Sequence, residues 1–336
     1  MEIFTQFLAL FHVAVVFGTI IMFGALGEII TEKSGNLNLG VPGIMYLGGI
    51  AGLTASFIYE NNNPDANGII SALLALVASF VFAALGGLLY SFLTITLRTN
   101  QNVTGLTLTI FGSGIANFLG GMLNSFAGGV GQVKVAKASS AFTAYVTAIA
   151  GNSTDDIRYA LFAYGWMTYV AIAFAVFLHI FLNKTRTGLN LRATGENPAT
   201  ADAAGINITR YKYLSTCIGA GISGFGGLYY TMENTPCTSG SWANDGTIEA
   251  LGWLAVALVI FATWRPLSAI WGAYTFGFTY WLWQLFQRSL TNRAAELFKM
   301  LPYVVTLIVL IAVSLRRKKE DQPPAHLGLP YFREDR

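Results

Sequence analysis

The chain has 336 residues, of which 54% are hydrophobic and only 11% are charged. Its apolar residues come in blocks close to the ~20 residues that a helix needs to cross a hydrocarbon core. Several blocks are apolar all round instead of amphipathic, which excludes a soluble protein built on one or two cores. The formal net charge of +3 says little about partners, but the placement of the charges is informative.

We expect an all-α, polytopic transmembrane bundle with about nine (8–10) membrane segments. The apolar runs cover about residues 8–28, 39–59, 69–97, 103–123, 157–182, 213–232, 247–264, 267–287 and 300–315. Glycine and proline interrupt the second run, so it forms either one continuous helix or a pair of half-helices. The expected division is a transmembrane domain over 1–316, with a polar loop at 184–212, and a cytoplasmic tail over 317–336.

The basic residues in the short loops predict the orientation, because cytoplasmic loops retain Lys and Arg. If successive runs cross the membrane in opposite directions, one side carries Lys33, Arg98, the 184–212 loop, Arg265 and the basic residues 316–319. That side is therefore expected to be cytoplasmic, with the N-terminus outside and the C-terminus inside. The first run lacks a basic leader and a small-residue cleavage site, so we interpret it as a retained span.

The sequence offers no arrangement typical of catalysis. Its three histidines, His12, His179 and His326, are scattered, and neither HxxxH nor CxxC spacing occurs. A Walker-type GxxxxGK[ST] loop is also absent from the sequence. We therefore expect no enzyme activity, no metal and no cofactor in this chain.

Polar residues near membrane depth are costly and therefore informative. The segment 28–43 contains Asn36 and Asn38 between two apolar runs, and forms either a cytoplasmic turn or a re-entrant break that lines a path. Asn102 and Thr104 open the fourth run, where they either cap a helix or hydrogen-bond a polar solute. Glycine clusters inside the spans predict close helix packing, with hinges next to a conduit as the alternative.

Four segments together resemble a known family. They are SGNLNLGVPGIM near the first spans, LRATGENPATADAAGINITRYK in the polar loop, GWLAVALVIFATWRP in the seventh run, and MLPYVVTLIVLIAVSLRRKK with the tail LGLPYFREDR. The chain resembles, over nearly its whole length, the permease subunits of ABC importers for nucleosides and simple sugars. That family is grouped with the branched-chain amino acid and ribose permeases.

The resemblance implies a multi-pass protein of the cell inner membrane that works with several partners. These are an ABC ATPase subunit that binds ATP and Mg²⁺, a second related permease, an extracytoplasmic solute-binding lipoprotein, and membrane lipid; no nucleic acid is implied. The two permeases are expected to form a heterodimer, or a homodimer if no second permease exists. The polar segment 124–157 is a candidate surface for the binding protein.

The resemblance also implies that the polar loop contains the coupling helix that docks on the ATPase. Its residues here are Glu196, Asn197, Pro198, Asp202 and Gly205. The residues fit this role, since Asn is a good N-cap, Pro suits the first helical position, and Gly stops a helix, here after about two turns. Pro42 stands where family members often carry an acid, so no role of that acid is transferred.

The expected substrate is a nucleoside or a related simple sugar. A base and a ribose need an aromatic ring and several amides or hydroxyls. The candidate path residues are Asn36, Asn38, Asn102, Thr104, Phe111 and Asn117. An ion-coupled secondary transporter of a small polar solute is the main alternative, but few acids lie well inside the runs. A membrane scaffold is a further alternative, which would not require a coupling helix.

Overall fold

The computed structural model describes residues 2–129, 133–145, 157–233, 242, 246–282, 297, 300–316 and 322–332. Every regular element within these ranges is helical, which confirms the all-α prediction for the described part. The long helices are α1 (Glu2–Lys33), α2 (Val41–Asn62), α3 (Gly68–Ser91), α4 (Gln101–Phe126), α8 (Trp166–Lys184) and α11 (Ile208–Glu233). The shorter ones are α5 (Ala136–Thr143), α7 (Ile157–Phe162), α9 (Arg186–Glu196), α10 (Pro198–Ala203), α12 (Thr247–Phe261), α13 (Pro266–Trp281) and α15 (Leu301–Arg316).

Five helices among the described residues are long and apolar enough to cross a membrane: α1, α2, α3 continued to Thr96, α4 and α8. The apolar stretches of α12 and α15 are shorter. Within the described residues each predicted run contains helical structure, but the fifth run divides into α7 and α8, which residues 163–165 separate. Nine crossings and the orientation of the termini stay predictions.

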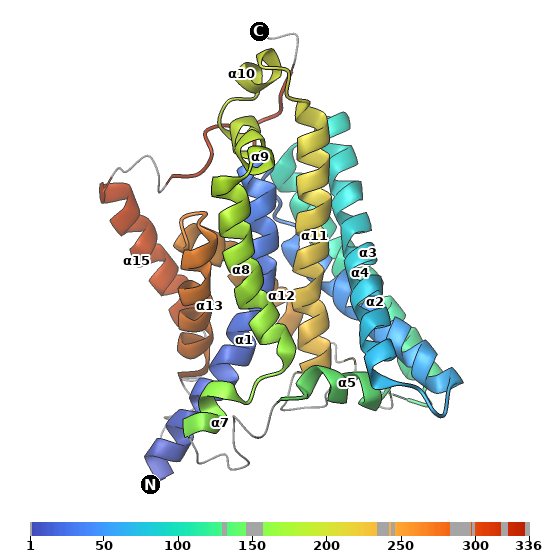
Figure 1. Ribbon diagram of the computed structural model, residues 1–336. Coiled ribbons are helices and arrows are strands. Elements are labelled where there is room, and N and C mark those ends of the chain that lie inside the picture. Colours follow the sequence, from blue (N-terminus) through green and yellow to red (C-terminus); the bar gives the residue numbers. More distant parts are fainter. Residues whose placement is uncertain are drawn as a thin grey trace.

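The centre of the bundle is formed by α1, α2 and α11. In the most apolar stretch of each span, 72% of the residues of α1 and 78% of those of α2 are buried. The buried share is 28% in α3 and 33% in each of α4 and α8. α11 packs against α1, α2 and α3, and Figure 1 shows these long helices running side by side. α3, α4 and α8 therefore present apolar surface outward, as helices next to lipid or a second subunit do.

Close backbone contacts hold this centre together. A Cβ on Gly227 of α11 would lie 1.8 Å from the carbonyl oxygen of Met45, and one on Gly27 would lie 2.2 Å from that of Gly219. These glycines confirm the prediction of close helix packing. Gly114 and Gly121 of α4 differ, because no heavy atom lies within 4 Å of a Cβ at either position.

The second run forms one continuous helix, α2, of 22 residues, and not a pair of half-helices. Pro42 lies in its first turn, where a missing N–H costs no intrahelical hydrogen bond. The third run continues as a five-residue π-helix, η1 (Phe92–Thr96), which is followed by Arg98 at φ 56°. Single π turns are rare and often occur near functional sites.

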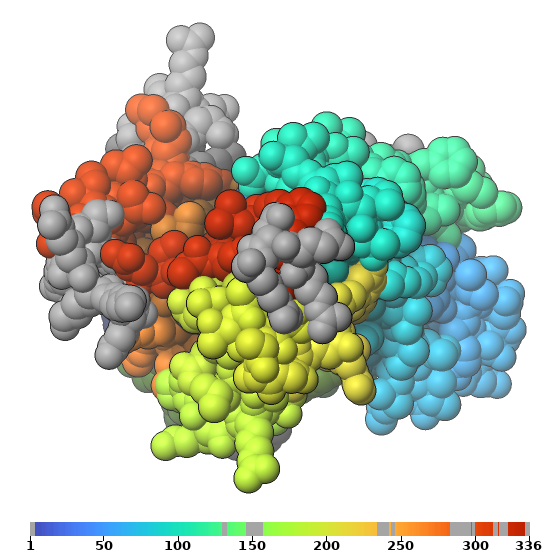
Figure 2. All heavy atoms as spheres, turned by 90° about the horizontal axis from the view of Figure 1, so that it is seen from above, coloured from blue at the N-terminus to red at the C-terminus, as the bar shows by residue number. Residues whose placement is uncertain are grey.

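The two ends of the molecule differ in structure. α5 and α7 lie at the end where the chain begins, and α9 and α10 lie at the opposite end, beside the last described residues (Figure 1). Seen from that second end, residues 322–332 lie across the surface between α9–α10 and the α3–α4 side (Figure 2). This end carries the candidate site.

Candidate coupling surface

The polar loop folds into two short helices, of which sequence analysis anticipated one. Asn197 caps α10, since its side chain accepts a hydrogen bond from the Thr200 N–H at 3.0 Å, and Pro198 is the first helical residue. The predicted cap is thereby confirmed. α10 is shorter than expected, at six residues, and Gly205 at φ 83° follows its end. The preceding helix α9 was not predicted; Thr185 caps it by accepting from Gly188 N–H at 3.0 Å.

α9 rests directly on the end of α1. A Cβ on Gly195 would lie 2.4 Å from the Lys33 carbonyl oxygen and 3.0 Å from the Gly35 nitrogen, so only glycine fits at this contact. Leu191 and Thr194 of α9 are buried, and Asn190 donates to the Tyr211 hydroxyl at 3.0 Å. The loop is thus attached to both α1 and α11, which makes it a mechanical extension of the bundle.

Residues 322–332, which we call the tail strap, join this loop to the bundle. His326 N–H donates to the Gly195 carbonyl at 3.0 Å, and Gly328 N–H donates to the Gly35 carbonyl at 3.2 Å. Leu327 packs on the main hydrophobic core. The strap therefore holds the end of α9 on the α1–α2 turn.

The strap also contacts both predicted coupling acids. Ala325 N–H donates to a Glu196 carboxylate oxygen at 3.4 Å, and the Tyr331 hydroxyl donates to Asp202 at 3.0 Å. The guanidinium carbon of Arg98 lies 4.5 Å from the centre of the Phe332 ring, a cation–π distance. The two carboxylates are therefore already engaged within this chain.

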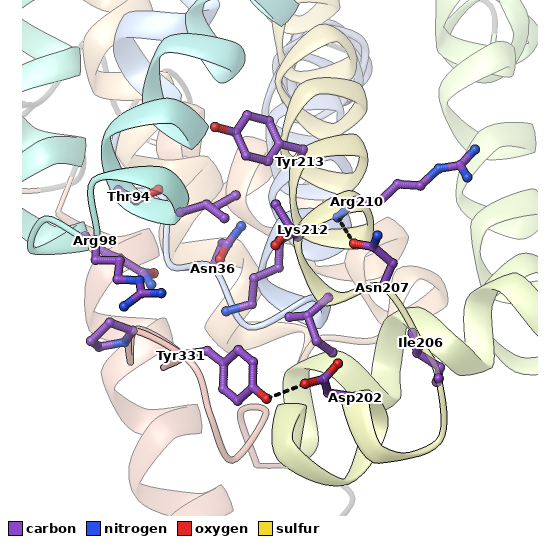
Figure 3. Close-up of a pocket in the computed structure, with 16 residues that line it drawn as sticks. Asn36, Thr94, Arg98, Asp202, Ile206, Asn207, Arg210, Lys212, Tyr213 and Tyr331 are labelled. Atoms are coloured by element: carbon purple, nitrogen blue, oxygen red, sulfur yellow. Dashed lines mark hydrogen bonds between the residues drawn. The ribbon is translucent and has the colours of Figure 1, made fainter. Parts of the chain in front are cut away.

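A cavity of about 690 Å³ lies beside the strap. Figure 3 shows Asn36, Thr94, Arg98, Lys212 and Tyr331 around it, with Asp202 and Tyr331 joined by their hydrogen bond. Lys212 is only 4% exposed although it belongs to the basic loop. Sequence analysis placed that lysine at the end of the polar loop, and the structure shows it packed into the bundle.

The six predicted path residues do not meet in one place. Asn36 lines the cavity, donates to the Thr216 hydroxyl at 2.9 Å, and has a buried side-chain oxygen without a hydrogen-bond partner. Asn38 is buried, with its N–H bound to Glu28 at 2.9 Å and its side-chain oxygen bound to Gly40 N–H at 2.9 Å. The segment around both asparagines is a turn between α1 and α2.

The other four path residues lie on α4. Thr104 is buried and bonds to the Asn100 carbonyl at 2.8 Å, and Asn102 is exposed in the first turn, where Asn100 is the cap. Phe111 is 48% exposed on the outer face, and the side-chain oxygen of Asn117 is buried without a hydrogen-bond partner. A path through these residues stays a prediction, and a part of the candidate docking segment 124–157 falls outside the described residues.

The tail strap was missed in the sequence because it follows a strongly charged run. Its signal was available: LGLPYF is a short apolar and aromatic stretch in a polar tail, and such residues are expected to be buried. The contacts of Gly35 and Gly195 with this stretch join positions more than a hundred residues apart in sequence. Local patterns carry no information about such a pairing.

The strap is expected to loosen at acidic pH. Burial and the nearby Lys212 charge lower the pKa of His326 below its ordinary value of 6.5, and its Nδ1 is buried without a partner. Because the pKa of His326 is lower in the docked strap than in the released one, the released strap binds a proton more readily. Docking is therefore favoured above about pH 6.5 and becomes weaker as the pH falls below that value.

Hydrogen exchange of residues 322–332 between about pH 7.5 and about pH 5.5 measures this effect, after correction for the intrinsic rate. Protection is expected to fall at the lower pH. His326→Gln should remove that pH dependence, whereas His179→Gln, at a partly buried position of α8, should preserve it. Equal protection at both pH values in the unmodified chain would contradict the prediction.

The fold and this surface define a polytopic helical membrane protein with a short capped helix at one end. The sequence profile of the family described as "Branched-chain amino acid transport system / permease component" matches residues 10–310. The chain belongs to that family.

Three relatives are similar over most of their length. The chain is 31% identical to the putative glucose ABC transporter permease protein TsgC13 of Haloferax volcanii, covering 77% of this chain and 72% of the relative. It is 28% identical to the guanosine ABC transporter permease protein NupQ of Bacillus subtilis, covering 92% of each. It is 26% identical to the nucleoside ABC transporter permease protein NupC of Lactococcus lactis, covering 88% of this chain and 89% of the relative.

Proposed function

We propose that this chain is the permease subunit of an ABC importer that provides the translocation path for a nucleoside, or for a related simple sugar, and couples it to a partner ATPase. The observation that carries the proposal is the capped helix α10, supported by α9 at the end of the bundle, in a chain that belongs to this permease family. ATP and Mg²⁺ belong to the partner. This chain contributes the translocation path and the helix α10 that contacts the ATPase.

The charge distribution and the family support the rest of the arrangement. The α9–α10 end carries most of the loop lysines and arginines and is assigned to the cytoplasm, with about nine crossings over 1–316 and a cytoplasmic tail at 317–336. In this arrangement the protein lies in the inner membrane and receives solute from a lipoprotein outside.

A second related permease is expected to pack on α4. Its outer face exposes Ile110, Phe118 and Phe126, and Gly114 and Gly121 leave open space between them. Small residues on an apolar helix face allow a second helix to approach closely in lipid. The path would then run between the two permeases, near the α4 residues Phe111 and Asn117.

Reconstitution tests the proposal. The chain is placed in proteoliposomes with its proposed partner ATPase and second permease, and uptake of labelled guanosine and glucose from the binding protein is measured. Uptake is expected to require ATP and the ATPase and to survive collapse of ion gradients. Uptake by the chain alone, driven by a sodium or proton gradient, would instead support the ion-coupled transporter, which the family does not favour.

A further inference from the structure

A second cavity on the cytoplasmic side, of about 800 Å³, is lined by an excess of positive charge. Its basic residues are Lys33, Lys184, Arg192 and Arg265, and Glu196 is the one carboxylate among the described residues of its lining. We call this cavity the basic pocket. It is separate from the cavity beside the tail strap, and the proposed transport path does not use it.

The basic residues come from three helix ends and from the short helix α9, which meet at this pocket. Lys33 ends α1, Lys184 ends α8, Arg192 lies on α9, and Arg265 precedes α13. α1 and α8 are candidate membrane spans that end at these two lysines, so the pocket lies where the hydrocarbon core gives way to lipid headgroups. That is the level at which phosphate groups of a bilayer are found.

One corner of the pocket is fixed by a hydrogen bond, and one of its guanidinium groups has an unmatched donor. Trp264 lies in the left-handed region at φ 55° and donates its indole N–H to Glu32, which fixes the corner that carries Arg265. The Nε of Arg192 is buried and has no hydrogen-bond partner among the described residues. Glu196 already accepts from the tail strap. An anion would satisfy this arrangement, since guanidinium groups bind phosphate oxygens well.

The surface beneath the pocket is apolar. α8 and α13 pack against each other, and within about two turns of the pocket they leave large side chains exposed. On α8, Phe177 is 58% and Ile180 is 50% exposed, and on α13, Leu267 is 38% and Trp271 is 78% exposed. A ligand with an anionic head and hydrocarbon tails would match both parts, which a free phosphate ion would not.

We propose that the basic pocket binds the phosphate headgroup of an anionic phospholipid, whose acyl chains lie along α8 and α13. Basic pockets between helices at the cytoplasmic surface have the chemistry for such headgroups. Because Arg192 and Glu196 both lie on α9, the bound lipid links the coupling loop to the membrane surface. The proposal rests on the proposed function only for the side of the membrane.

Lipid retention by the full-length chain tests the proposal without any ATPase or nucleoside. The purified chain is placed in nanodiscs that contain phosphatidylglycerol and phosphatidylcholine and is then released into detergent. Native mass spectrometry measures how much of each lipid stays bound. Lys184→Gln combined with Arg192→Gln is expected to lower phosphatidylglycerol retention about tenfold. Arg186→Gln combined with Arg210→Gln is the matched control, because both residues are exposed in the same loop and neither lines the pocket.

The outcomes separate lipid from other anions. Retained phosphatidylglycerol that millimolar inorganic phosphate does not displace supports a lipid site, whereas displacement indicates a site for free phosphate and overturns the proposal. Equal loss in both double variants, or equal retention of both lipids, also overturns it. If the pocket variant keeps its lipid but no longer co-purifies with the ATPase, the pocket is a protein-docking surface. Loss of lipid preference with nucleoside uptake unchanged would leave the proposed function standing.

Discussion

Replacement of both Glu196 and Asp202 by lysine is expected to lower ATP-dependent solute uptake at least tenfold while membrane insertion remains normal. Both carboxylates lie on the candidate coupling surface and accept hydrogen bonds from the tail strap, so charge reversal changes the surface offered to the proposed ATPase and also releases Ala325 and Tyr331. Charged hydrogen bonds are worth about 1.5–3 kcal/mol when buried and less at exposed sites such as Ala325. The measurement is labelled nucleoside uptake in proteoliposomes, with ATP hydrolysis recorded in parallel.

Two controls separate the coupling role from the strap. Tyr331→Phe removes one strap hydrogen bond without changing charge, and it is expected to reduce uptake much less than the double lysine variant. Glu196→Gln combined with Asp202→Asn retains the side-chain size, and should give an intermediate value. Normal solute-stimulated uptake by the double lysine variant would rule out α10 as the coupling helix.

Gly227→Ala is expected to prevent stable assembly of the helix bundle. A Cβ at this position would lie 1.8 Å from the Met45 carbonyl oxygen, which is backbone and cannot rotate away. α2 and α11 would have to separate, and overpacking of this kind costs about 1–3 kcal/mol or more. The measurement is the fraction of detergent-solubilised protein that elutes as a single species, together with its unfolding midpoint.

Gly121→Ala is the matched control, because α4 is also a long apolar helix and its Cβ would meet no heavy atom within 4 Å. Alanine favours a helix over glycine by about 1 kcal/mol, so this variant should be as stable as the parent or slightly more stable. A Gly227→Ala chain with an unchanged unfolding midpoint would show that the contact with Met45 does not determine packing.

Local features were predictable because they depend on neighbouring residues. The apolar runs anticipated the helices, and the Asn197–Pro198 pair anticipated the start of α10, because a cap is formed by residues within one turn. The burial of Lys212 was not predictable, since it depends on how α11 packs beside the α1–α2 turn. The same holds for the position of α9, which is set by the contact of Gly195 with the end of α1.

The candidate path was the weakest part of the prediction. Asn38 was selected for its amide group, but that group caps its own turn at Gly40 N–H. Phe111 was selected as an aromatic platform, but it lies on the outer face of α4, where a second subunit is needed to enclose anything. In the proposed arrangement the path lies between two permeases, and one sequence cannot locate it because part of its lining would belong to the other chain.

The contact between Gly195 and the end of α1 makes the longest helix a lever. α1 has 32 residues, so at 1.5 Å per residue it extends about 48 Å, roughly the full thickness of a bilayer with its headgroups. A tilt of a few degrees at the α9 end therefore displaces the far end by several ångströms. A push on the candidate coupling surface would thus reach the opposite face through α1, and the helices packed on α1 would have to move with it.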